Sequence, residues 1–176
     1  MIALTIFLLV ESEKENSEYN LFLDYLPKSL EDHPLFFKDE KKINYIKGSC
    51  LHFKFKSWKE KLQSEYESLL KINVEDFFKI KEFTFEKYIF FRALVWSRNF
   101  HTQIKLEKNE NSEIEAESEA EIEMEFSSLI PVVDMFNTDP NNINTDWFFE
   151  KDSGKFVLKA IKEIQQNEEV NNFKYF

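Results

Sequence analysis

Glycine is scarce in this chain, with only Gly48 and Gly154 among 176 residues. A dinucleotide-binding fingerprint and a phosphate-binding P-loop both require glycines at fixed, close spacings, so both routes to nucleotide binding are excluded. Cysteine is scarcer still, because Cys50 is the only one. A single cysteine excludes a disulfide scaffold and a cysteine-based zinc site, and it is typical of a reducing intracellular compartment, cytoplasmic or nuclear. The three histidines form no HExxH motif, so no metal site is expected.

Negative charge is concentrated in one segment. The net charge is −10, and residues 110–125 hold eight glutamates and no basic residue. Outside this segment 25 acidic residues stand against 23 basic ones, so the rest of the chain offers no basic footprint, and no nucleic-acid partner is expected. Acids alternate with small or apolar residues here, and like charges on one face are costly, so we predict a disordered surface loop over residues 106–126. An acidic docking arm is the alternative.

The first residues contain a short apolar run, Ile2–Val10, which is interrupted by Thr5 and followed by Glu11. A bilayer-spanning helix takes about 20 apolar residues, so no membrane partner is expected. No basic segment precedes the run, which argues against a signal peptide. We predict a buried helix or strand, because periodicity alone does not distinguish the two.

Apolar residues are plentiful, at 43% of the chain and including 20 phenylalanines, so a substantial core is expected. An apolar stripe between Tyr19 and Leu26 predicts a short helix, and Pro27 and Pro34 predict that a loop follows it.

Two longer helices are predicted downstream. Residues 57–60 match a capping box, Ser-Trp-Lys-Glu, which predicts a helix N-terminus at Ser57. Thr84 is the predicted cap of the next helix, which runs to about Phe100 and is apolar around most of its circumference, as a buried helix is. The first of these helices is expected to turn one stripe of residues toward the core: Trp58, Leu62, Tyr66, Leu69 and Leu70.

The last third of the chain has a different periodicity. Leu129–Val133 is predicted to be a short strand or extended segment, and Trp147–Glu150 and Lys155–Ala160 are predicted to be two strands joined by a turn. The fold class is therefore predicted to be α+β, with a helical N-terminal two thirds followed by a small β-rich part. A plain helical scaffold is an alternative that requires helix in the last third.

Two segments carry a distinctive order of residues. Residues 93–100 read Ala-Leu-Val-Trp-Ser-Arg-Asn-Phe, and residues 128–137 read Ser-Leu-Ile-Pro-Val-Val-Asp-Met-Phe-Asn. The predicted hairpin follows, then Asn-Glu-Glu-Val at residues 167–170, and then Tyr175. This order resembles the SET-domain methyltransferases of the split type, which include the plant Rubisco large-subunit lysine methyltransferase. Near the N-terminus, residues 8–11, 17–19 and 25–27 resemble the part of that family where a helical insertion begins.

The resemblance implies a division of the chain and a function. Residues 1–11 correspond to a remnant of the N-terminal SET part, 12–105 to the helical insertion, 106–126 to the acidic loop, and 127–176 to the C-terminal, β-rich SET segment. The implied activity is S-adenosylmethionine-dependent methylation of lysine on a partner protein. Such a transfer requires a held cofactor and an aligned channel for the amine.

The resemblance also implies site residues. Cofactor binding falls to Arg98, Asp134, Asn137 and Thr138, and the catalytic hydroxyl falls to Tyr175. A guanidinium suits the carboxylate of the cofactor, because it donates paired hydrogen bonds. Each residue also has a structural interpretation: Arg98 can interact with the end of its helix, and Asp134 and Asn137 lie in a turn-rich stretch. Tyr175 lies next to the last residue, where chains fray.

The sequence departs from the family pattern in several places. Thr138 stands where the family has histidine, and Asn167 stands where it has glycine, a place that asparagine tolerates if the turn is left-handed. Tyr175 comes one residue later than the pattern predicts, which in a strand reverses the direction of the side chain. The family's Gly-x-Gly segment and its C-terminal helical substrate domain are not in the sequence. We therefore expect an incomplete enzyme as given, with a catalytically inactive, SET-derived protein-binding module as the alternative.

Overall fold

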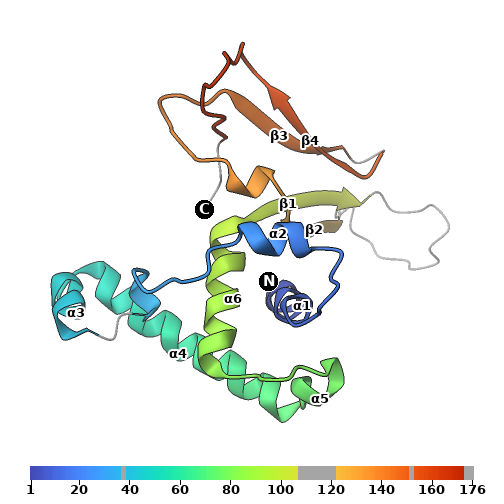
Figure 1. The fold of residues 1–176 in the computed structure, drawn as a ribbon. Helices are drawn as coiled ribbons and strands as arrows, with labels where there is room; N and C mark the ends of the chain where they lie inside the picture. Colours follow the sequence, from blue (N-terminus) through green and yellow to red (C-terminus); the bar gives the residue numbers. More distant parts are fainter. Residues whose placement is uncertain (37–38, 107–121, 151–152, 173–176) are drawn as a thin grey trace, which may run out of the picture. The chain divides into compact units, whose positions relative to one another are not determined.

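The computed structural model describes residues 1–36, 39–106, 122–150 and 153–172. Within these ranges the chain forms α-helices followed by two small antiparallel sheets, so the predicted α+β class is confirmed (Figure 1). The chain divides into two compact units, residues 1–97 and residues 98–176. None of the helices in the described ranges is long and apolar enough to cross a membrane.

The first unit is helical. Its elements are α1 (Ile2–Ser12), α2 (Asn20–Tyr25), the 3-10 turn η1 (Pro34–Phe36), α3 (Glu40–Ile46), α4 (Cys50–Lys71), α5 (Val74–Phe78) and α6 (Phe85–Arg98), whose last residue begins the second unit. The N-terminal apolar run is therefore a helix, with Leu8 and Leu9 almost fully buried. The loop predicted between Pro27 and Pro34 follows α2 directly.

Helix α6 lies at the centre of this core. Thr84 caps it as predicted, because its Oγ1 accepts a hydrogen bond from the backbone N–H of Lys87. The helix crosses α4 (Figure 1), and the Trp58 and Trp96 rings of the two helices lie 4.6 Å apart. Its buried residues cover most of its circumference, as predicted: Tyr88, Ile89, Phe91, Arg92, Ala93, Leu94 and Val95.

Helix α4 begins earlier than the sequence indicated. Its N-cap is Ser49, whose hydroxyl accepts a hydrogen bond from the N–H of His52, and Ser57 lies inside the helix. The prediction of a helix start at Ser57 is therefore wrong. Gly48, with a φ of 81°, supplies the left-handed residue that ends the preceding segment, so the real boundary lies beside it. Leu62 and Leu69 are buried as predicted, whereas Leu70 is 45% exposed.

Replacement of Ser49 by alanine is expected to lower the free energy of unfolding of residues 1–97 by about 1 kcal/mol, because the first turn of α4 loses its cap. The measurement is urea denaturation followed by far-UV circular dichroism. Ser57→Ala is the control, and it should leave stability unchanged or slightly higher, because alanine favours a helix interior. A larger cost at Ser57 than at Ser49 would contradict the assignment.

The second unit contains two hairpin-like pairs. Strand β1 (Asn99–Leu106) pairs antiparallel with β2 (Ile122–Leu129), and β3 (Thr145–Glu150) pairs antiparallel with β4 (Lys155–Ala160). The predicted β3–β4 hairpin is confirmed. Because no α-helix occurs in the described residues after 98, the structure contradicts the helical-scaffold alternative.

Aromatic rings join β1 to the β3–β4 hairpin. Phe100 of β1 is 2% exposed, and its ring lies 5.0 Å from that of Trp147 and 5.2 Å from that of Phe156. Trp147 and Phe156 stack on each other across the hairpin at 5.3 Å. Aromatic pairs of this kind stabilise neighbouring strands, so the β-rich part has a small core of its own.

Three boundaries differ from the predictions. Residues 99–105, expected in the helical region, are strand, and so are residues 122–126, expected in the acidic loop. In the backbone register Glu123 lies opposite Lys105 and Glu125 opposite Gln103, so this pairing sets no acidic position opposite another. The segment expected to be extended after Leu129 instead turns into η2 (Val133–Met135). The remaining loop residues, 107–121, lie outside the described ranges.

Candidate functional site

Arg98 and Asp134 lie side by side in the second unit. Arg98 ends α6, and its Nη1 lies 3.5 Å from Oδ2 of Asp134. The Asp134 side chain is fully buried, whereas that of Arg98 is 18% exposed. The turn η2 fixes the aspartate, because its backbone N–H donates to the carbonyl of Ile130 at 2.9 Å. A buried carboxylate requires a countercharge, and Arg98 provides it while still reaching the surface.

Asn137 lies where the chain after η2 meets a segment that returns from the end of the hairpin. Its carbonyl accepts a hydrogen bond from the N–H of Asn172 at 3.0 Å. Its Nδ2 donates to a carboxylate oxygen of Glu169, and residues 137 and 171 form a parallel bridge. Residues 169–172 are named the return segment here.

Asn144 and Thr145 hold the return segment from another direction. The Asn144 side chain is fully buried; its Nδ2 donates to the Glu169 carbonyl at 2.7 Å, and its Oδ1 accepts from the Asn171 N–H at 2.8 Å. The Thr145 hydroxyl donates to the Asn171 carbonyl at 2.8 Å. The return segment is therefore bound by the residues around 137 and by the start of β3.

Asn172 has an unusual environment. It is fully buried, and among the described residues neither its Oδ1 nor its Nδ2 has a hydrogen-bond partner. A buried amide without partners costs about 1–3 kcal/mol, and such groups are rare in native proteins. Because the backbone of Asn172 is bonded to Asn137, this unsatisfied amide lies beside a residue that the sequence implied in cofactor binding.

The structure brings two of the implied site residues into contact. Arg98 is paired with Asp134, and Asn137 and the half-buried Thr138 follow on the same loop. Tyr175 lies outside the described residues. Among those residues, no group of three histidine, cysteine or acidic side chains is arranged to hold a metal ion.

Sequence reasoning missed Asn144, Glu169, Asn171 and Asn172. The crowding of asparagine and aspartate between residues 137 and 146 was a signal, because an amide donates and accepts and can therefore replace missing strand bonds. The side chains of Asn137 and Asn144 contact residues that are 25 or more positions away in sequence, and the sequence pattern holds no indication of that pairing. Asn167, which stands where the family has glycine, has a φ of 67°. The backbone there is therefore left-handed, a conformation that asparagine tolerates.

No protein-family model matches this sequence, and no curated protein matches it. Any family assignment therefore depends on the residues and contacts described above.

Proposed function

We propose that the chain is a SET-type methyltransferase module that binds S-adenosylmethionine and acts on lysine in a partner protein, in the cytoplasm or nucleus. One observation carries the proposal. The segments that make up the ordered motif are far apart in sequence, yet Arg98 contacts Asp134, and Asn137 contacts the return segment. Cofactor binding requires that segments distant in sequence contact each other in the fold. A chance likeness of short segments carries no such requirement.

The residues present fit the cofactor. Arg98 can donate paired hydrogen bonds to the carboxylate of the amino-acid end, with Asp134 fixing the orientation of the guanidinium. The Asn172 amide lacks partners among the described residues, and it offers one acceptor and two donors to a polar group. Thr138 would offer its main-chain groups in place of the family's histidine. The bound cofactor would supply a methyl group on a sulfonium, and the Tyr175 hydroxyl would support the acceptor amine.

A second candidate is a SET-derived module that binds a partner protein without methyl transfer. The specific observation in its favour is that the Arg98 guanidinium already contacts a carboxylate of the chain itself. A ligand carboxylate must share the guanidinium with Asp134, and this competition lowers affinity. The replacement of the motif histidine by Thr138 acts in the same direction.

Cofactor binding separates the two candidates. The full chain is titrated with S-adenosylmethionine by isothermal calorimetry, and Arg98→Ala is expected to raise Kd more than tenfold, since a hydrogen bond to a charged group contributes about 1.5–3 kcal/mol. Arg98→Lys should retain part of the affinity, because it keeps the charge but not the paired donors.

Two controls keep the result interpretable. Lys159→Ala, an exposed residue of β4, should leave Kd unchanged. Because Arg98→Ala leaves the Asp134 carboxylate buried, the double variant Arg98→Ala/Asp134→Asn is measured as well, and thermal unfolding is followed for each variant. Unchanged affinity in Arg98→Ala would remove this residue from the site, and absence of binding by the unaltered chain would favour the second candidate.

A further inference from the structure

Positive charge is concentrated at the junction of α3 and α4 in the first unit. Residues 41–59 cover most of α3, the turn at Gly48 and the first turns of α4, and they hold six lysines and no acidic residue. This stretch is named the basic tip here. In a chain with a net charge of −10 the concentration is local, and it attracts a negatively charged partner. Its lysines are Lys41, Lys42, Lys47, Lys54, Lys56 and Lys59.

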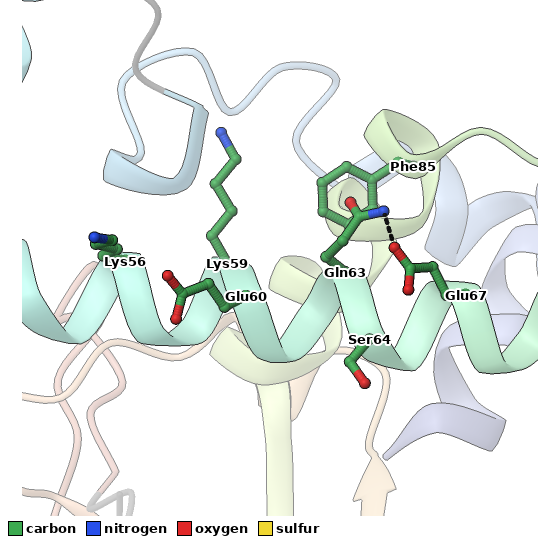
Figure 2. A pocket seen from close by; sticks show the side chains of 7 residues that line it. All are labelled: Lys56, Lys59, Glu60, Gln63, Ser64, Glu67 and Phe85. Carbon is green, nitrogen blue, oxygen red and sulfur yellow. Dashed lines mark hydrogen bonds between the residues drawn. The ribbon is translucent and has the colours of Figure 1, made fainter.

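Five of these lysines are available to a partner. Lys42 is the exception, because its amine lies 2.7 Å from a carboxylate oxygen of Asp32. The other five are exposed, and none of them forms an ion pair in the parts of the chain that the structure describes. The basic tip ends at Glu60, which lies beside Lys59 on α4 (Figure 2).

Large apolar side chains are exposed among the lysines. Tyr45 of α3 is 88% exposed, and Leu51 and Phe53 of α4 are 47% and 68% exposed. Exposed apolar residues that are surrounded by polar ones mark surfaces that bind another protein, and aromatic residues are enriched in such interfaces. The basic tip therefore has the composition of a surface that docks an acidic protein segment.

The chain itself contains a segment of the opposite charge. Residues 110–121 hold six glutamates and no basic residue, and from residue 113 onward the glutamates alternate with isoleucine, alanine or serine. A contact between two basic tips, or between two acidic segments, would place like charges together. A contact between the tip of one copy and the acidic segment of another places opposite charges together, and such an interface is head-to-tail.

We propose that the basic tip of one copy binds residues 110–121 of a second copy of this chain. The inference goes beyond methyl transfer, because none of the proposed cofactor residues belongs to the basic tip or to residues 110–121. Failure of cofactor binding would leave it intact, and failure of self-association would leave the proposed cofactor site intact.

The full chain is examined by sedimentation velocity over a range of protein concentrations. In about 50 mM salt the mean sedimentation coefficient is expected to rise with concentration, and in about 0.5 M salt the rise should disappear, because salt screens exposed charges. Lys47→Glu/Lys54→Glu on the tip is expected to weaken association about tenfold or more, since two attractions become repulsions. Glu115→Lys/Glu117→Lys in the acidic segment should have the same effect.

The matched control is Lys71→Glu/Lys81→Glu. It makes the same change in net charge as the tip variant, at exposed residues of the same unit outside the basic tip, and it should weaken association less than about threefold. Equal losses in the tip variant and the control would mean that only net charge matters, which overturns the proposal. Circular dichroism melting verifies that each variant is folded.

A mixture of the two defective variants tests the head-to-tail arrangement. The tip variant keeps its acidic segment, and the Glu115→Lys/Glu117→Lys variant keeps its tip, so the equimolar mixture should associate although neither variant does so alone. No association in the mixture, or an unaltered chain that stays monomeric at every concentration, contradicts the proposal. Tighter binding of a single-stranded dT oligonucleotide, or of vesicles containing phosphatidylserine, to the basic tip would replace the second copy with another class of partner.

Discussion

Replacement of Glu65 by alanine is expected to lower the free energy of unfolding of residues 1–97 by about 3–5 kcal/mol. The carboxylate of Glu65, on α4, accepts a hydrogen bond from the Tyr88 hydroxyl at 2.8 Å and from Nε of Arg92 at 3.2 Å. The Arg92 side chain is 9% exposed, so the substitution leaves a guanidinium in the core without its countercharge. Burial, together with the hydrogen bond to Glu65, raises the pKa of Tyr88, so in the unaltered chain the phenol is the neutral donor to this carboxylate.

The measurement is urea denaturation followed by tryptophan fluorescence. Trp58 and Trp96 lie in this unit, so a Trp147→Phe background restricts the signal to it. Glu67→Ala, at an exposed position of the same helix, is the control and should cost less than about 0.5 kcal/mol.

The double variant Glu65→Leu/Arg92→Leu separates the two possible causes. It removes both charges, and it should be much more stable than Glu65→Ala, because a buried ion pair is often replaced by apolar residues at little cost. If Glu65→Ala cost less than about 1 kcal/mol, the pair would be solvated in solution and would not belong to the core.

Replacement of Asn144 by alanine is expected to destabilise residues 98–176 by about 2–4 kcal/mol. The amide of Asn144 satisfies the carbonyl of Glu169 and the N–H of Asn171, and a buried group that loses its partner costs about 1–3 kcal/mol. Trp147 reports on this unit, so thermal unfolding is followed by its fluorescence in a Trp58→Phe/Trp96→Phe background.

Asn142→Ala is the matched control for Asn144. Asn142 lies in the same loop. Within the described part of the chain its side chain accepts a hydrogen bond only from the exposed amine of Lys162, so we expect a cost below about 0.5 kcal/mol. Similar effects at the two positions would mean that the return segment is not held by Asn144.

Local patterns were sufficient for α6 and for the β3–β4 hairpin. Helix α6 is specified by its Thr84 cap and by the apolar residues around its circumference, which all lie close together in sequence. The β3–β4 hairpin is likewise specified by two short strands and the turn that joins them. The start of α4 was missed for a related reason. Residues 57–60 have the composition of a capping box, but a residue caps a helix only where its own backbone is not helical. The backbone meets this condition beside Gly48, at Ser49, whereas Ser57 lies inside the helix.

The candidate site was predictable only in part. The ordered motif named Arg98, Asp134 and Asn137, and the structure places the first two in contact. The role of Asn144 depends on its hydrogen bond with Asn171, which lies beyond the whole β3–β4 hairpin in sequence. The periodicity of a sequence does not indicate such a long-range pairing. Strand β2 had the same difficulty, because the sequence does not show which residues of β1 lie opposite its acidic residues in the backbone register.

The bridge between Asn137 and Asn171 has a consequence for the order of folding. The β3–β4 hairpin lies entirely between these two residues, so closing the bridge encloses it. Pairing within the hairpin joins residues close in sequence, whereas the bridge must bring together ends of a much longer loop, whose closure costs more entropy. We therefore expect the hairpin to form first and to shorten the effective loop, so that Asn137 acquires its native partners late.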